Sequence, residues 1–129
     1  GHVLLIRRRA DPGKGLLAFP GGFVEAASDR SVEDAMLREL QEETGIKVPE
    51  KVLRGNIKAG KVFDAIDRSA RGRTITHAFK IVLSEDGAGL PKLRAASDAA
   101  KASWHPIGAL QRDQFFEDHW DILQYFLGV

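Results

Sequence analysis

The stretch RELQEETG, residues 38–45, is the feature that most constrains the fold of this chain, because a helical pattern is followed there by a glycine that ends a helix. Ser31 suits the N-cap of a helix, and Asp34 three residues later completes a capping-box pattern. Gly45 suits the first residue beyond the last turn. Between these ends an apolar stripe repeats at helical spacing, formed by Val32, Ala35, Met36 and Leu40. We therefore predict a helix over residues 31–44.

Three glutamates, Glu39, Glu42 and Glu43, crowd the last turns of this helix. Like charges at such spacings repel by about 0.2–0.5 kcal/mol per pair, and the negative end of the helix dipole also disfavours carboxylates. Acidic residues on a helix face are often plain solvated surface, and Arg38 is placed to pair with Glu42. A local conflict of this kind is nevertheless where function is expected. Because carboxylate oxygens suit hard cations such as Mg²⁺, we predict a metal site here.

Length and composition indicate one soluble globular domain over residues 1–129. The chain is 43% hydrophobic and 29% charged, with a formal net charge of +1, so it has no general attraction for nucleic acid or for an anionic membrane. No apolar run approaches the length of a membrane span. Cysteine is absent, which excludes disulfides and fits a reducing compartment. We expect a cytoplasmic protein without nucleic-acid or membrane partners.

The start of the chain is unusual for a natural N-terminus. Gly1 and His2 run straight into an apolar stretch, and the only methionine is Met36. Gly1 and His2 would suit the turn of a hairpin. We expect that a preceding N-terminal strand, and any upstream domain, is missing from this sequence.

Apolar alternation and turn residues divide the rest of the chain into short segments. We predict strands over residues 3–9, 16–19, 51–58, 61–64, 74–83 and 102–107, with Gly60 as an interruption. We predict an amphipathic helix over residues 108–127 and a loop over residues 84–97. Strands on both sides of a central helix, with a closing helix, predict an α/β arrangement in which a sheet is covered on two faces.

Residues 22–46, GFVEAASDRSVEDAMLRELQEETGI, resemble the Nudix box, whose pattern is G-x5-E-x7-R-E-U-x-E-E-x-G-U with U aliphatic. The match is complete from Arg38 onward. The resemblance implies a Nudix fold, an α/β/α sandwich around a mixed sheet, and hydrolysis of a nucleoside diphosphate linked to another moiety. It assigns a metal ion, Mg²⁺ with Mn²⁺ as an alternative, to Glu39, Glu42 and Glu43. Arg38 would orient these glutamates through a salt bridge.

The first half of the box departs from the pattern. Counting back from Arg38, the box glutamate is expected at position 30, where this chain has Arg30. The stretch from Gly22 to Arg38 is two residues longer than the pattern, and we expect the extra residues in the loop 26–30. In the family this first glutamate is less central than the later three, so metal binding can survive. Lower activity, or a non-catalytic member, stays open.

Residues 48–83 resemble the Nudix domain of bifunctional nicotinamide mononucleotide adenylyltransferase/ADP-ribose pyrophosphatases. The similarity extends to the sequence FEDH at residues 116–119. It implies ADP-ribose as the substrate, cleaved to AMP and ribose 5-phosphate. An adenylyltransferase domain, where the parent protein has one, would lie upstream of Gly1.

Further candidates for substrate binding lie outside the box. A polar loop carries Arg68, Arg71 and Arg73. Each alone is as readily surface charge as a ligand, but as a group they suit a clamp for pyrophosphate or ribose, because guanidinium forks fit phosphate oxygens. Phe63 suits stacking on adenine, although packing in the core is the more ordinary explanation. Gly22 lies in a glycine-rich turn that lets backbone approach a ligand closely.

We predict a metal-assisted hydrolysis, in which the ion neutralises charge on the diphosphate and lowers the pKa of the attacking water. A carboxylate must accept the proton of that water. The sequence leaves open which one does so, Glu43, Asp98, Glu85 or Asp86. The partner would be a small-molecule nucleotide substrate, and hydrolases of this kind are often homodimers.

Two other functions stay open. A Nudix-like transcriptional regulator of NAD metabolism would bind ADP-ribose without hydrolysing it, and the irregular box suits one. Such regulators carry a winged-helix DNA-binding part after the Nudix part, whereas this chain ends at Val129. A Nudix hydrolase acting on an oxidised nucleoside triphosphate or a nucleotide sugar is the second alternative.

Overall fold

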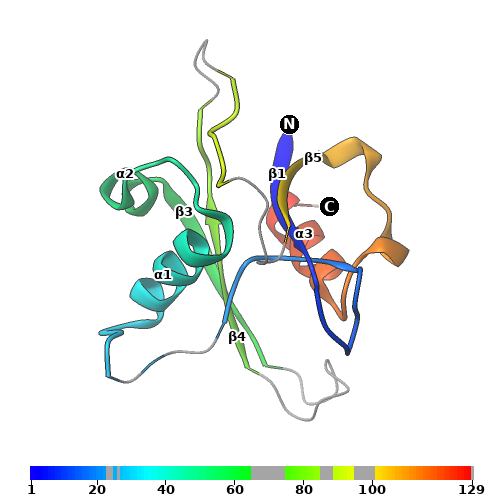
Figure 1. Cartoon of the computed structure of the whole chain (residues 1–129), viewed down its shortest axis with the longest axis horizontal. Coiled ribbons are helices and arrows are strands. Elements are labelled where there is room, and N and C mark those ends of the chain that lie inside the picture. The colour runs from blue at the N-terminus through cyan, green and yellow to red at the C-terminus, as the bar shows by residue number, and fades with distance from the viewer. Residues whose placement is uncertain (23–24, 26, 65–74, 85–88, 95–100, 129) are drawn as a thin grey trace.

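The computed structural model describes residues 1–22, 25, 27–64, 75–84, 89–94 and 101–128. Its strands are β1 (His2–Arg7), β2 (Leu17–Ala18), β3 (Ile57–Phe63), β4 (Thr76–Ile81) and β5 (Ala102–Pro106). Its helices are α1 (Val32–Thr44), α2 (Glu50–Gly55) and α3 (His119–Leu127), with 3₁₀ turns at Ile107–Ala109 and Arg112–Gln114. Figure 1 shows the strands between α1 and α2 on one side and α3 on the other.

The strands form two small sheets. In the first, β1 lies between β2 and β5 and pairs antiparallel with both, for example Ile6 with Ala18 and Leu4 with Trp104. In the second, β3 and β4 pair antiparallel. A parallel bridge joins Leu17 to Phe115, ahead of α3. The first sheet is thereby tied to the segment that leads into the last helix.

Strand β1 is covered on both faces because its side chains alternate between them. Leu4 packs against the cluster of Leu37, Ile46 and Leu53, which belongs to the α1 and α2 side. Leu5, fully buried, belongs instead to the cluster on the α3 side, with Leu17, Leu110, Phe115 and Leu123. The two-sided covering predicted from the order of elements is therefore present at this strand.

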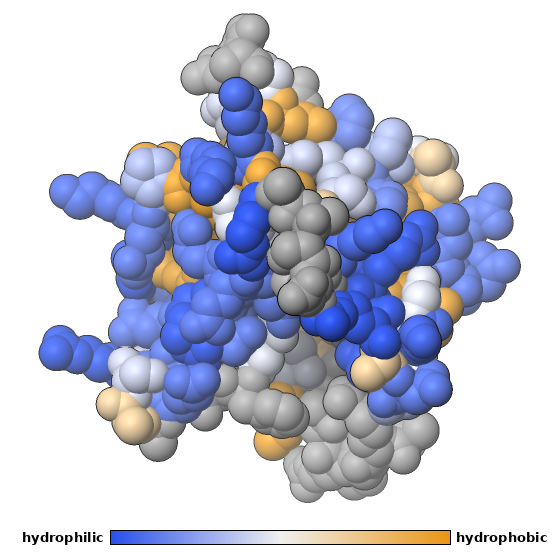
Figure 2. Space-filling view, in the orientation of Figure 1, coloured by the Kyte–Doolittle hydropathy of each residue, from blue (hydrophilic) through white to orange (hydrophobic). Residues whose placement is uncertain are grey.

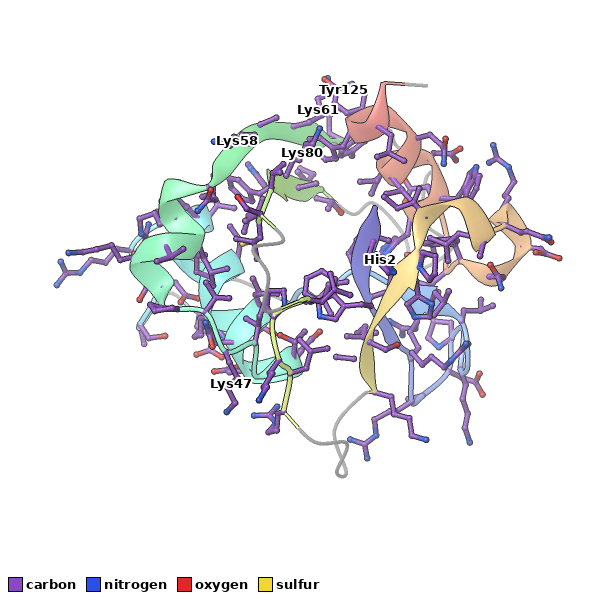
Figure 3. All side chains as sticks on the ribbon, turned by 90° about the horizontal axis from the view of Figure 1, so that it is seen from above. His2, Lys47, Lys58, Lys61, Lys80 and Tyr125 are labelled. Carbon is purple, nitrogen blue, oxygen red and sulfur yellow. The ribbon has the colours of Figure 1, made fainter. Side chains whose placement is uncertain are left out.

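The second sheet docks on α3. The ring of Phe63 lies edge-on to Tyr125, with the ring centroids 5.7 Å apart. Lys80 Nζ donates a hydrogen bond to the backbone oxygen of Phe126 at 3.0 Å, and Lys61 Nζ lies 5.8 Å from the Tyr125 ring centroid. Figure 3 shows these lysines reaching toward the helix from β3 and β4. Because carbonyls near a helix C-terminus carry partial negative charge, a lysine there is favourable.

The helix predicted over residues 31–44 is confirmed by α1, and the strands predicted over residues 3–9, 74–83 and 102–107 are confirmed by β1, β4 and β5, each with shorter bounds.

Hydrophilic side chains predominate on the face seen in Figure 2, where apolar ones form small separate groups. Within the described ranges, no helix combines the length and the apolar character that crossing a membrane requires.

The strand predicted over residues 51–58 is wrong for residues 51–55, which belong to α2, whereas residues 57–58 lie in β3. Pro49 is the N-cap of α2, and the N–H groups of Val52 and Leu53 donate hydrogen bonds to its backbone oxygen. A short apolar run fits a strand and a helix equally well from the sequence. Burial of Leu53 in the core favours the helix here. Gly60, predicted as an interruption, lies inside β3, whose irregularity falls between Ile57 and Ala59 instead.

The helix predicted over residues 108–127 is wrong in its first half, because α3 begins only at His119. The N–H of Phe116 donates to the oxygen of Leu17 at 2.8 Å rather than to a residue one turn earlier. Glu117 then adopts a positive φ of 46°, which interrupts helical geometry. Phe115 and Phe116 are buried, and both pack against side chains of β1 and β2.

Leu37 tests how much α1 depends on the core, because its side chain is 1% exposed. We expect Leu37→Ala to lower the free energy of unfolding by about 2–5 kcal/mol, through lost burial and the cavity left behind. The measurement is urea denaturation followed by circular dichroism. Val52→Ala is the control, at a side chain 45% exposed on α2, and should change that free energy by less than about 0.5 kcal/mol. Equal losses in both variants would contradict this packing.

Candidate functional site

Helix α1 presents its glutamates from a segment with both ends capped. Ser31 Oγ accepts a hydrogen bond from the N–H of Asp34 at 3.0 Å, which confirms the predicted N-cap. Gly45 adopts left-handed backbone, with φ 58° and ψ 30°, and its N–H donates to Gln41 at 2.8 Å. A Cβ at Gly45 would lie 2.4 Å from the Cβ of Arg94. Both the backbone and the space therefore require glycine at this helix stop.

Arg38 lies between two of the three glutamates predicted to bind metal. Its Nη1 donates to Glu39 Oε1 at 2.7 Å and to Glu42 Oε2 at 3.1 Å. A shared cation relieves the repulsion expected between carboxylates on one helix face. Arg38 thus contacts both side chains that it is predicted to orient. The metal-binding role of those side chains stays a prediction.

Asp29 is the principal partner of Arg38, although the sequence pattern does not single it out. Its two oxygens accept hydrogen bonds from Arg38 Nε and Nη2, both at 2.9 Å, a bidentate pairing. The Asp29 side chain is only 3% exposed, and the N–H of Glu25 donates to its Oδ2 at 2.7 Å. These bonds, first from Arg38 and then from the Glu25 backbone, lower the pKa of Asp29 from its ordinary value.

The lengthened loop before α1 folds into a turn that delivers this aspartate. The N–H groups of Ser28 and Asp29 donate to the oxygen of Glu25, at 3.1 and 2.7 Å. Glu25 Oε1 also lies 3.5 Å from Arg38 Nη1. Arg30, at the position expected for the box glutamate, is exposed. The acid that pairs with Arg38 is therefore Asp29, one position before the place where the box pattern expects a glutamate. The only sequence signal for it is that an acidic residue lies next to that expected place.

Two glycines bring backbone against the glutamates. The N–H of Gly21 donates to Glu43 Oε2 at 3.2 Å. A Cβ at Gly22 would lie 2.5 Å from Glu39 Cδ, so the missing side chain permits this close approach. Burial raises the pKa of Glu43 to about 7; the Gly21 hydrogen bond opposes the rise, and the charges of Glu39 and Glu42 reinforce it. A cation beside these carboxylates would favour their ionised forms.

Arg94, from a distant segment, places a positive charge at the acidic C-terminal end of α1. Arg94 Nη2 donates to the backbone oxygen of Glu42, and the Arg94 N–H donates to the oxygen of Thr44 at 2.9 Å. A guanidinium on the last carbonyls opposes the negative end of the helix dipole. No local sequence pattern points to Arg94, because its partner lies 52 positions away along the chain.

The other predicted site residues are not brought to this place by the described structure. The Phe63 ring lies against α3, 5.7 Å from the Tyr125 centroid and 6.4 Å from that of Phe126. This is the packing alternative, and a role for Phe63 in substrate binding stays a prediction. The remaining candidates lie outside the described residues: Arg68, Arg71, Arg73, Glu85, Asp86 and Asp98.

The donor chemistry of Glu39, Glu42 and Glu43 fits a hard divalent cation, because such ions prefer carboxylate oxygens. In the part of the chain that the structure describes, no three acidic, histidine or cysteine side chains are grouped so that they could already hold a metal ion. Arg38 engages one oxygen each of Glu39 and Glu42. Coordination of one ion by all three glutamates would therefore require their side chains to come closer together than they lie here.

A sequence model of the NUDIX domain matches residues 1–126. The chain belongs to the Nudix family. This match confirms the resemblance seen in the box, and the structural neighbours below confirm the expected α/β Nudix fold.

Relatives of this Nudix domain include hydrolases. The chain is 37% identical over 125 residues to an ADP-ribose pyrophosphatase of Methanocaldococcus jannaschii, covering 97% of this chain and 65% of that protein. A solved bifunctional NMN adenylyltransferase/ADP ribose pyrophosphatase from Francisella tularensis, complexed with AMP and a Mn ion, matches with a TM-score of 0.87 and 39% identity. That match covers 98% of this chain and 37% of the larger one.

A third relative has been crystallised with DNA. Shewanella oneidensis NrtR matches with a TM-score of 0.75 and 28% identity, over 95% of this chain and 52% of that protein, and it has been crystallised with a 27mer DNA. The chain spans less than two thirds of each of these three relatives.

Asp29 should make folding stability depend on acid. We expect Asp29→Asn to lower the free energy of unfolding at neutral pH, because the bidentate pairing with Arg38 is weakened. The folded-state pKa of Asp29 is lowered, so its stabilisation is complete above the unfolded-state pKa of about 4 and is lost as the pH falls through the folded-state value. Urea denaturation at a series of pH values should show the difference between the variants shrink below about pH 4.

Asp113→Asn is the control for losing one negative charge, at an exposed carboxylate in Arg112–Gln114. It should change the free energy of unfolding less than Asp29→Asn does at neutral pH. A loss in Asp29→Asn that is independent of pH would contradict the assignment of the pairing to the ionised carboxylate.

Proposed function

We propose that this chain hydrolyses the diphosphate of a nucleoside diphosphate derivative, and that ADP-ribose is cleaved to AMP and ribose 5-phosphate. The observation that carries the proposal is that each of the three glutamates is held at the end of α1, Glu39 and Glu42 by Arg38 and Glu43 by the N–H of Gly21. Similarity to an ADP-ribose pyrophosphatase supports the choice of substrate. AMP bound in the Francisella tularensis relative supports the product.

Glu39, Glu42 and Glu43 would hold a divalent cation, which we propose is Mg²⁺, with Mn²⁺ as an alternative. When bound, such an ion neutralises charge on a diphosphate and lowers the pKa of a water molecule. The carboxylate donors suit it chemically. The Mn ion in the Francisella tularensis relative supports a divalent metal.

The roles of the chain's own residues follow from their contacts. Arg38 positions two of the glutamates and is itself fixed by Asp29. The N–H of Gly21 positions Glu43. A carboxylate must take the proton of the attacking water, and the proposal assigns this to Glu43 or Asp98.

Substrate contacts are proposed from the sequence alone. The guanidinium groups would clamp the diphosphate or ribose, the Phe63 ring would stack on adenine, and the Gly22 backbone would face the substrate. The three arginines concerned are Arg68, Arg71 and Arg73. The proposed assembly is a homodimer, which the family resemblance favours, and the proposed location is the cytoplasm, which the absence of cysteine fits.

An assay with matched substrates tests the function. The protein is incubated with ADP-ribose, a nucleotide sugar and an oxidised nucleoside triphosphate, each with and without Mg²⁺, and the products are separated by ion-exchange chromatography. We expect AMP and ribose 5-phosphate from ADP-ribose only when the metal is present. Glu43→Gln should lower kcat by at least about 100-fold while the circular dichroism spectrum is unchanged. Full activity in this variant would refute the role of Glu43.

A second function is favoured by the likeness to NrtR and by the irregular box. In that case the chain would bind ADP-ribose as a signal without cleaving it. Titration calorimetry with ADP-ribose separates the two functions. Binding without turnover of any substrate, with Mg²⁺ present, would favour the sensing function over hydrolysis.

The adjacent glycines provide a matched pair of variants. In Gly22→Ala the new Cβ would meet Glu39 Cδ at 2.5 Å, whereas a Cβ at Gly21 meets nothing within 4 Å. We expect Gly22→Ala to lower kcat/KM by about 10–100-fold, because it displaces a metal-binding carboxylate. Gly21→Ala keeps the N–H that contacts Glu43 and should stay close to wild type. Equal activities of the two variants would contradict the close approach.

A further inference from the structure

Helix α3 begins with a histidine that contacts Phe19, the residue just after β2. His119 Nδ1 accepts a hydrogen bond from the N–H of Phe19 at 3.0 Å, across 100 positions of the chain. The two rings also stack, with centroids 5.5 Å apart and planes 17° from parallel. An Nδ1 that accepts carries no proton, so the neutral ring holds its proton on Nε2.

The histidine is itself firmly placed. The backbone N–H of His119 donates to the backbone oxygen of Phe116 at 3.1 Å, and the rings of the two residues lie edge to face with centroids 5.7 Å apart. Phe116 is 4% exposed, and the guanidinium of Arg8 lies 3.9 Å from its ring centroid. A Cβ at Gly13 would lie 2.4 Å from Phe116 Cδ1. Close packing therefore fixes the position of the Phe116 ring, against which the His119 ring packs.

Phe19 leads directly into the turn that touches the glutamates. Pro20 follows it, and the proline ring restricts the backbone to a narrow range of φ. The next residue, Gly21, donates its N–H to Glu43 Oε2 at 3.2 Å. Because one stiff residue separates the two hydrogen bonds, the position of the Phe19 N–H constrains the position of the Gly21 N–H.

We propose that His119 is a positioning residue of the site: by accepting the Phe19 N–H, it sets where the backbone of Gly21 meets Glu43. This inference rests on the proposed function, because it takes Glu43 as a metal ligand. The contrasting explanation is that the His119 ring only fills space in the core, in which case its acceptor nitrogen has no effect on the site.

Two substitutions separate the acceptor from the ring. His119→Phe keeps an aromatic ring against Phe19 and removes the acceptor, whereas His119→Asn removes the ring and keeps an acceptor at the corresponding atom. Asp121→Asn is the control for disturbing the first turn of α3, because Asp121 pairs there with Arg112 on the surface. Unfolding by urea is measured for every variant, and comparisons are made at temperatures where all are folded.

The first readout is the dissociation constant for Mn²⁺ alone, measured by electron paramagnetic resonance without nucleotide. We expect His119→Phe to weaken Mn²⁺ binding by about 10-fold, and His119→Asn and Asp121→Asn to stay within about twofold of wild type. The second readout is the Gly21 amide resonance in ¹⁵N–¹H spectra of the metal-free protein. It should move in His119→Phe and keep its wild-type position in Asp121→Asn.

Wild-type Mn²⁺ affinity together with an unmoved Gly21 resonance in His119→Phe would overturn the inference. An effect of His119→Asn as large as or larger than that of His119→Phe would also overturn it, because loss of the ring or a general disturbance of the packing, and not loss of the acceptor, would then explain the change. The proposed function fails separately, if the wild type binds Mn²⁺ but cleaves no nucleotide. The comparison of Mn²⁺ affinities still decides the role of His119 in that case.

Discussion

The guanidinium of Arg38 is the group around which the acidic end of α1 is organised. It bonds to Asp29 of the preceding loop and to Glu39 and Glu42 of its own helix. Without a cation there, carboxylates in the last turns would repel one another and oppose the helix dipole. The hydrogen bonds that Arg38 donates to Asp29, and then to Glu39, raise the pKa of Arg38 above its ordinary value. The charge that holds loop and helix together is therefore permanent.

The site also depends on both layers that cover β1. Leu4 and Leu5 point to opposite faces of the strand and contact different hydrophobic clusters. Strand β2 pairs with β1 and leads into the turn before α1. Phe19, just after β2, bonds to α3, and Gly21 bonds to α1. The turn that meets the glutamates is thus anchored by helices from both sides of the sheet, so the site requires the complete fold.

Sequence patterns predicted those elements whose signals are local. Helix α1 was predicted with its caps, because Ser31 and Gly45 act on backbone groups within one turn of themselves. Residues 51–58 were misread, because a short apolar run does not show whether it will pack as a helix or pair as a strand. The helix predicted from residue 108 failed because the Phe116 N–H bonds to Leu17, a distant strand residue.

The sequence by itself determined which residues form the acidic cluster, since helical geometry places Glu39, Glu42 and Glu43 together once α1 exists. It also determined that Arg38 would accompany them. Only the tertiary structure decided that Asp29 pairs with this arginine, because the length of a loop does not state where its side chains point. The same holds for Arg94 on the carbonyls of α1 and for the α3 histidine on Phe19. Those contacts join segments 52 and 100 positions apart, and only packing around β1 brings them together.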